Sequence, residues 1–197
     1  MFSVFSSVCG EKKFWRRYWQ DHLGLSSAQA AWNYSIKGAG GKKRTLSLDG
    51  RIDLANVNDR QSRIRIAGWM KDVAKEIGLP KTTLSKIKGV VFETRQGYKS
   101  KDSKRQNADI ANASKAYAHL YIPVILLFST QIDSDVAQRY RENLWLLLTG
   151  TVDGNPTESA YAFCRQVIGY DLADFFQRYS PRIKAEIEIA LRALLTP

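Results

Sequence analysis

The stretch KGVVFETRQGYKSKDSKRQNADIA, residues 88–111, places a single carboxylate, Glu93, at the end of an apolar run. The run predicts a β-strand over Val90–Gln96. Side chains alternate along a strand, so Glu93 and Arg95 should share one of its faces. Positive charge surrounds the acid, because eight Lys or Arg lie in the span Lys81–Arg105. The stretch therefore predicts a strand with Glu93 near its end and with Lys and Arg side chains around that acid.

The segments that follow complete a layered arrangement of strands and helices. Residues 103–120 have helical periodicity, and YIPVILLF (121–128) is short, branched and uncharged, which is typical of a fully buried strand. A helix over 133–143 and a strand LWLLLTG (144–150) come next. We predict an α/β fold with a small mixed central sheet flanked by helices.

The first third of the chain is expected to begin with a helical segment, residues 1–36. Its aromatic side chains recur at roughly helical spacing and are assigned to the core or to a dimer surface. KGAGGKKRT (37–45) is expected to be a flexible basic connector, because it contains three glycines. TLSLDGRIDLANV (45–57) predicts a hairpin, since Asp49-Gly50 is a dipeptide that tight turns between strands prefer.

Residues 60–88 have the spacing of a helix-turn-helix. Apolar residues at helical intervals lead to Gly78, and a second helix is expected over 81–88. In such a motif the start of the second helix enters the major groove of DNA. The candidate DNA contacts are Lys81, Thr82, Thr83, Ser85 and Lys86. An ordinary helical corner matches the same pattern, and both interpretations stay open.

Composition favours a polyanionic partner. The chain has 197 residues, a net charge of +11 and a pI near 9.7, which is more charge than solubility requires. No apolar run is long enough to span a bilayer, and the N-terminal residues make a poor signal peptide. Two Cys and two His suffice neither for a disulfide framework nor for a zinc site. We expect a cytoplasmic protein that binds no membrane.

The C-terminal part, residues 155–197, is expected to hold two helices. The last should begin at Ser180-Pro181, with serine as the cap and proline at the first helical position. No internal repeat or long low-complexity segment is apparent in the sequence. A single domain over residues 1–197 is therefore predicted, with residues 89–150 as its core.

An acid two residues before a cation, at the end of a central strand, is typical of metal-dependent nucleases. The carboxylate holds a divalent cation, and the cation beside it neutralises charge that builds on the scissile phosphate. The surrounding Lys and Arg would neutralise the phosphates of the bound strands. The interpretation of Glu93 is thus that it recruits Mg²⁺. An ion pair between Glu93 and Arg95 or a neighbouring Lys is the structural alternative.

Residues 89–113 and 116–150 together resemble the catalytic core of type II restriction endonucleases of the PD-(D/E)XK superfamily, and FCRQVIGYDLADFF (163–176) is similar to the helical tail of some of them. The resemblance implies a restriction-endonuclease-like fold and Mg²⁺-dependent cleavage of double-stranded DNA at a short site by a homodimer. Glu93 matches the second acid of the motif. Arg95 occupies the position of the family's lysine, with Gln96 adjacent.

The departure from lysine affects the expected chemistry, because arginine cannot give up a proton and so cannot act as a general base. Lys99 or Lys101 could supply the amine from a displaced position. The first metal-binding acid is expected to be Asp53, with Asp72 as second choice. Phosphate contacts are expected from the cations that follow, Lys104 and Arg105.

A second class of function stays open beside the endonuclease. In it, the helix-turn-helix binds DNA in a non-enzymatic regulator, and the α/β part only dimerises. A third interpretation, an RNA-binding protein, is weaker, because aromatic stacking motifs on strands are not evident.

Overall fold

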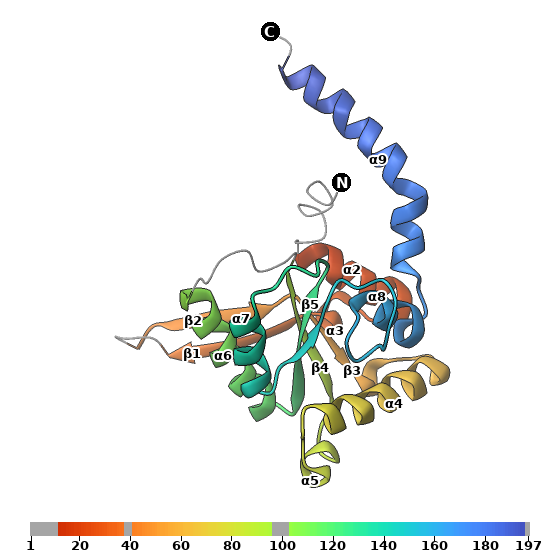
Figure 1. The fold of residues 1–197 in the computed structure, drawn as a ribbon. Helices are drawn as coiled ribbons and strands as arrows, with labels where there is room; N and C mark the ends of the chain where they lie inside the picture. The colour runs from red at the N-terminus through yellow and green to blue at the C-terminus, as the bar shows by residue number, and fades with distance from the viewer. Residues whose placement is uncertain (1–11, 38–40, 96–102, 196–197) are drawn as a thin grey trace.

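A computed structural model describes residues 12–37, 41–95 and 103–195 (Figure 1). Its centre is a four-stranded sheet in the order β3-β4-β5-β6, in which β3 is antiparallel to β4 and the other neighbours are parallel. The strands are β3 (Gly50–Asp53), β4 (Gly89–Arg95), β5 (Tyr121–Leu127) and β6 (Leu146–Leu148). The predicted small mixed sheet flanked by helices is confirmed.

One face of the sheet packs against helices from both ends of the chain. These are α2 (Lys12–Leu23), α4 (Arg60–Glu76), α8 (Ala160–Ala162) and the π-helical turn Phe163–Ile168. The aromatic residues Trp15, Tyr18 and Trp19 of α2 are buried there, and Trp19 stacks on Phe92 of β4. The assignment of these aromatics to the core is confirmed.

The other face carries α6 (Ser103–Ala118) and α7 (Ser134–Glu142). Val91 of β4 and Ile125 of β5 belong to this layer, as the alternation of strand side chains requires. Asp133 caps α7 by accepting the backbone N–H groups of Asp135 and Val136. The predicted helix and strand order from residue 103 to residue 150 is therefore confirmed.

A separate two-stranded ribbon precedes the sheet. It consists of β1 (Trp32–Lys37) and β2 (Lys43–Leu48), paired antiparallel, after the short helix α3 (Ser27–Ala30). The helical prediction for residues 1–36 is wrong over β1, and the predicted connector contributes to both strands. Figure 1 shows the ribbon extending away from the four-stranded sheet, with α4 on the far side of that sheet.

The predicted turn at Asp49-Gly50 is wrong, because the chain runs on from β2 into β3 instead of reversing. The glycine has another cause. A Cβ atom at Gly50 would lie 2.4 Å from Nε1 of Trp19, so the approach of the indole excludes any side chain here. The dipeptide marks a close packing contact between β3 and α2.

The predicted helix-turn-helix forms only in part. The first helix is α4, but α5 (Lys81–Leu84) is a single turn that does not extend to residue 88. The backbone N–H of Lys88 donates to the carbonyl of Leu120 at 2.8 Å, and β4 starts at the next residue. The chain must leave the helix to enter the sheet, so the predicted recognition helix is cut short.

A long helix, α9 (Leu172–Leu195), follows the π-helical turn and leaves the body of the molecule (Figure 1). Pro181 lies inside it, so the predicted helix start at Ser180-Pro181 is wrong. The hydroxyl of Ser180 donates to the carbonyl of Phe176 within the same helix. Among the helices in the described residues, none combines the length and apolar character needed to cross a membrane.

Candidate metal and phosphate site

Glu93 and Arg95 meet at the C-terminal end of β4, as the alternation along the strand predicts. Nη2 of Arg95 lies 2.7 Å from Oε1 of Glu93. Glu93 is only 7 % exposed. The ion pair foreseen as the structural alternative for Glu93 therefore exists, and it also places a guanidinium directly beside the predicted metal-binding acid.

A carboxylate on α6 also holds this guanidinium, and a tyrosine on α7 supports that carboxylate. Nη2 of Arg95 lies 3.1 Å from Oδ1 of Asp109 on α6. The hydroxyl of Tyr140 on α7 donates to Oδ2 of the same carboxylate at 2.6 Å. Asp109 is 2 % exposed, and a buried carboxylate is tolerated only where it is paired and hydrogen-bonded. The arginine is thus fixed by acids from both the sheet and α6.

A second carboxylate reaches the same strand from the bend that joins β2 to β3. The backbone N–H of Asp49 donates to the carbonyl of Phe92, although the register partner of Phe92 is Gly50. Asp49 therefore lies just before the regular ladder, which begins at Gly50, and its side chain does not follow the alternation of β3.

The bend before β3 brings the carboxylate of Asp49 to the residue next to Glu93. Oδ2 of Asp49 accepts the backbone N–H of Thr94 at 2.8 Å, in place of a ladder partner. Asp49 is 4 % exposed, so this bond also satisfies a buried N–H group that would otherwise be costly. The end of β4 therefore has an acid from each of two neighbouring strands.

The two acids suit a hard divalent cation in part. Mg²⁺ is usually bound through one or two carboxylates, with water and substrate phosphate completing its six ligands. Across residues 12–37, 41–95 and 103–195 there is no group of three or more His, Cys, Asp or Glu that could enclose an ion. Asp49 and Glu93 supply the number of carboxylates that Mg²⁺ usually takes, and each is engaged here, Asp49 with the N–H of Thr94 and Glu93 with Arg95.

Asp53, the predicted first acid, lies at the opposite end of β3. Its register partner is Gly89, and four steps along β4 lead from that position to Glu93, about 13 Å at the usual rise of a strand. Oδ2 of Asp53 accepts the hydroxyl of Tyr121 at 2.7 Å. Burial, together with this acid, raises the pKa of Tyr121 to about 12, so the hydroxyl keeps its proton. Asp53 is therefore not brought together with Glu93.

Asp72, the second choice for the first acid, is not brought together with Glu93 either. It is exposed on α4, which packs on the other face of the sheet. The predicted base-contacting residues also lie far from Glu93, in and after α5, before β4 begins. Of these, only Thr83 is half-buried, and the others are exposed: Lys81, Thr82, Ser85 and Lys86. The sequence predictions for the acid and for the recognition helix therefore refer to opposite ends of β4.

The remaining predicted residues follow β4. Lys104 and Arg105 occur in the first turn of α6, the helix that carries Asp109. Gln96, Lys99 and Lys101 lie outside the described residues. The structure therefore leaves the position of a catalytic amine as a prediction from the sequence.

Three members of the site were missed from the sequence: Asp49, Asp109 and Tyr140. The sequence predicts a turn at Asp49-Gly50, and this prediction hid Asp49 as a member of the site. Asp109 and Tyr140 fall on predicted helices, and their spacing from Arg95 gives no signal that they meet. Comparisons of the chain with protein-family models, with curated proteins and with solved structures found no match.

Proposed function

We propose that this protein is a Mg²⁺-dependent endonuclease that hydrolyses phosphodiester bonds of double-stranded DNA at a specific sequence, as the resemblance to type II restriction endonucleases implies. The observation that carries the proposal is the hydrogen bond by which the Asp49 carboxylate accepts the backbone N–H of Thr94, the residue after Glu93. Two carboxylates and one guanidinium then lie at the end of β4.

In this proposal Asp49 and Glu93 hold the ion, which when bound supplies a polarised phosphate oxygen and an ionised water at neutral pH. Arg95 lies beside Glu93 and stabilises the charge that develops on the phosphate. Arginine stays protonated, so it cannot take the proton of the attacking water. That proton goes to solvent or to an amine, for which Lys99 and Lys101 are the candidates.

Net charge supports DNA as the substrate. The excess of +11 attracts a polyanion, and cations concentrate in the sequence on both sides of the site. A homodimer is part of the proposal, since each chain offers one such site and cutting both strands of a duplex requires two. Exposed apolar side chains of α9 are available for such pairing, including Ile189 and Leu191.

The test is incubation of supercoiled plasmid with the protein and Mg²⁺. Discrete linear fragments are expected from the unsubstituted chain, and nicked or intact plasmid from Glu93→Gln, which keeps the shape of the side chain but not its charge. Binding of duplex by Glu93→Gln should be retained or improved, because repulsion of phosphate falls. Normal cleavage by Glu93→Gln would refute the site, and sequence-specific binding without any cleavage would favour the non-enzymatic regulator.

A further inference from the structure

The β1–β2 ribbon has two chemically different faces. Its register alternates pairs such as Trp32↔Leu48 with pairs such as Ser35↔Thr45. Trp32, Tyr34 and Leu48 are buried against the α6–α7 side of the core. The residues of the opposite, outer face are polar, and most of them are exposed: Asn33, Ser35, Lys43, Thr45 and Ser47.

The buried face fixes the ribbon to the body of the protein. The hydroxyl of Tyr34 donates to Oδ1 of Asn112 on α6, and the ring of Trp32 meets His119 edge-on at 6.1 Å. A ribbon anchored in this way presents its outer face in a defined orientation. Such rigidity is what a recognition surface needs, because ordering it on binding then costs little.

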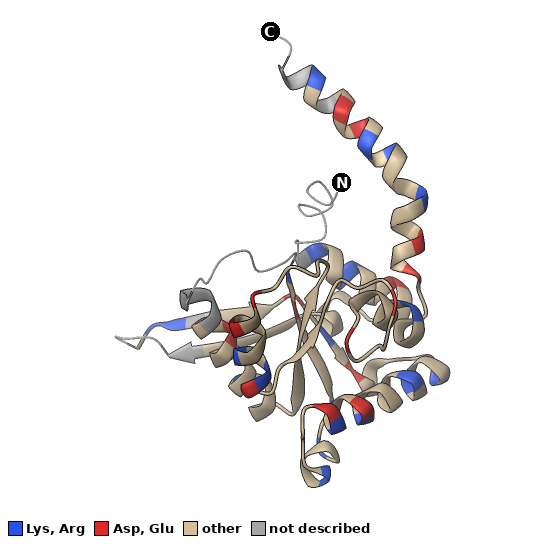
Figure 2. Ribbon diagram, in the orientation of Figure 1, with Lys and Arg blue, Asp and Glu red and all other residues tan. Residues whose placement is uncertain are grey.

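The outer face carries the side chains that distinguish base pairs. Asn bonds to adenine, Lys to guanine, and Ser or Thr to either, and the major groove of B-DNA is wide enough for a two-stranded ribbon. Between His22 and Leu48 the sequence contains four Lys or Arg and no Asp or Glu. Figure 2 shows the basic positions of β2 near the far end of the ribbon. No acid of this segment would repel phosphate.

The ribbon also leads directly to the candidate site, because β2 ends at Leu48 and Asp49 follows. The six steps from Lys43 to Asp49 extend about 20 Å in a strand, which is comparable to the width of a duplex. We propose that the outer face of the β1–β2 ribbon enters the major groove of double-stranded DNA and reads its bases. The inference rests on the proposed function only for the position of the scissile phosphate.

The ribbon in this proposal takes the role that the sequence suggested for α5. That single-turn helix lies at the end of β4 remote from Glu93, whereas the last strand of the ribbon ends at Leu48, directly before Asp49. The ribbon can then contact the bases of the same duplex whose phosphate lies at Asp49 and Glu93.

Binding is tested with Glu93→Gln protein and a randomised pool of DNA duplexes, followed by sequencing of the bound fraction. Enrichment of a sequence motif is expected. A major-groove ligand such as methyl green should compete, and the minor-groove ligand distamycin should not. RNA duplexes of the same composition should bind more weakly, because the major groove of A-form RNA is too narrow for side chains to read.

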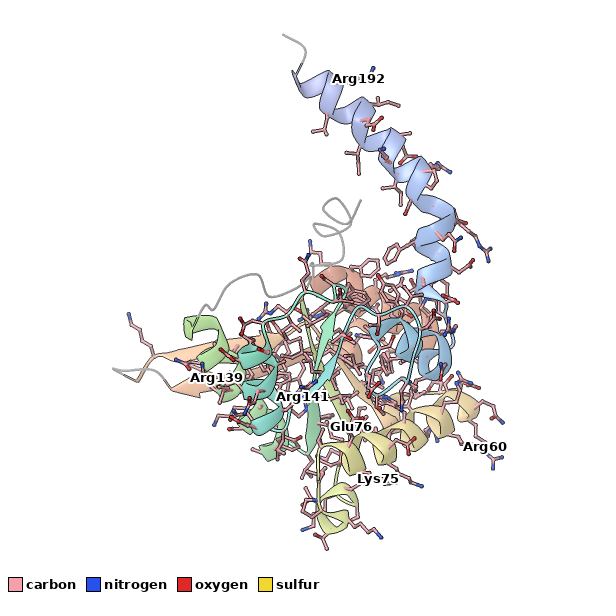
Figure 3. The ribbon with its side chains drawn as sticks, in the orientation of Figure 1. Arg60, Lys75, Glu76, Arg139, Arg141 and Arg192 are labelled. Carbon is pink, nitrogen blue, oxygen red and sulfur yellow. The ribbon has the colours of Figure 1, made fainter. Side chains whose placement is uncertain are left out.

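Substitutions then assign the surface. Asn33→Ala and Thr45→Ala should each lower discrimination at one base-pair position by about tenfold, with non-specific affinity nearly unchanged. Lys43→Ala should reduce the slope of log K against log salt by about one unit. The matched control is Lys75→Ala on α4, an exposed cation labelled in Figure 3, which should leave the selected motif and the slope unchanged.

Each contrary result has one meaning. If the protein binds no DNA duplex, or the ribbon variants select the same motif with the same slope, the ribbon is not the recognition surface. Equal competition by RNA duplexes or by distamycin overturns major-groove entry. If ribbon variants change the motif but plasmid is never cut with Mg²⁺, the inference stands and the proposed nuclease fails. If plasmid is cut with Mg²⁺ but the ribbon variants select the same motif with the same slope, the proposed nuclease stands and the inference fails.

Discussion

The two ends of the β3–β4 pair each have an aspartate, one from β3 and one from the bend before it, and these acids have different partners. At one end, Asp53 stays in a regular ladder and accepts hydrogen bonds from Tyr121 and from the backbone N–H of Ala55. At the other end, Asp49 lies in the bend before β3, and its carboxylate accepts the N–H of Thr94 on the neighbouring strand. The first acid bonds groups at the start of β5 and after β3, and the second bonds β4 at the residue after Glu93.

The comparison shows that strand geometry, and not residue type, separates a structural acid from a candidate ligand. Both aspartates belong to one short stretch of sequence, but Asp49 is buried and Asp53 is half-buried. Only Asp49 lies outside the regular ladder, at the end of β4 where Arg95 and Asp109 gather. Substitutions at the Asp49 end and at the Asp53 end should therefore differ in their effects on cleavage and on stability.

The largest expected effect separates the two aspartates by activity. Asp49→Asn should lower plasmid cleavage by several orders of magnitude, because a neutral amide binds a hard cation poorly. Asp53→Asn should leave cleavage within a few-fold, since an amide oxygen can still accept the Tyr121 hydroxyl. Single-turnover cleavage rates at saturating protein measure both. Similar losses in the two variants would mean that strand pairing, not metal binding, is being damaged.

The next effect is on stability and concerns the guanidinium. Asp109→Ala should lower the free energy of unfolding by about 3 kcal/mol, the lower end of the cost of breaking a buried ion pair, because Glu93 still pairs with Arg95. Urea denaturation followed by fluorescence measures it. Glu142→Ala, an exposed acid at the end of α7, is the control and should change stability by no more than about 0.5 kcal/mol.

Two substitutions of Arg95 test how its positive charge and its guanidinium shape each contribute to cleavage. Arg95→Lys keeps a cation and should retain partial cleavage, whereas Arg95→Ala should lose nearly all of it. The measurement is the single-turnover rate with duplex binding determined separately. If Lys99→Ala or Lys101→Ala abolishes cleavage and Arg95→Ala does not, the catalytic cation belongs to the segment after β4.

Much of the fold followed from periodicity, because β4, α6, β5, α7 and β6 each have a strong pattern over their whole length. The errors arose where a local signal competed with tertiary packing. Asp49-Gly50 has the composition of a turn, but its glycine is required by the indole of Trp19. Residues 85–88 have helical spacing, but pairing with the strand that follows α6 ended the helix early.

The site could be predicted only along one strand. Alternation placed Glu93 and Arg95 on one face, and the ion pair agrees. Asp109 and Tyr140 come from helices whose approach to β4 depends on how they pack, which spacing in the sequence does not specify. Asp49 required knowledge of where the β3–β4 ladder begins, and a residue just before a ladder does not follow the period of two.

Glycine substitutions sharpen the comparison by acting on the residue that follows Asp49. Gly50→Ala should destabilise the protein by about 1–3 kcal/mol, the usual cost of overpacking, because its Cβ would lie 2.4 Å from Trp19. It should also reduce cleavage, since Asp49 moves with the strand. Gly68→Ala on α4 is the control, as nothing lies within 4 Å of its added Cβ. That variant should gain about 0.5–1 kcal/mol from helix propensity.

The smallest expected effect compares the two tyrosines that donate to carboxylates at the two ends. Tyr121→Phe and Tyr140→Phe each remove one hydroxyl that bonds an aspartate, Asp53 or Asp109. Each should cost about 0.5–1.5 kcal/mol of stability, the net value of a typical hydrogen bond. Cleavage should separate them, because only Tyr140 supports the acid that holds Arg95 beside Glu93. Equal cleavage by both variants, at equal stability, would show that the contact of Asp109 with Arg95 is structural alone.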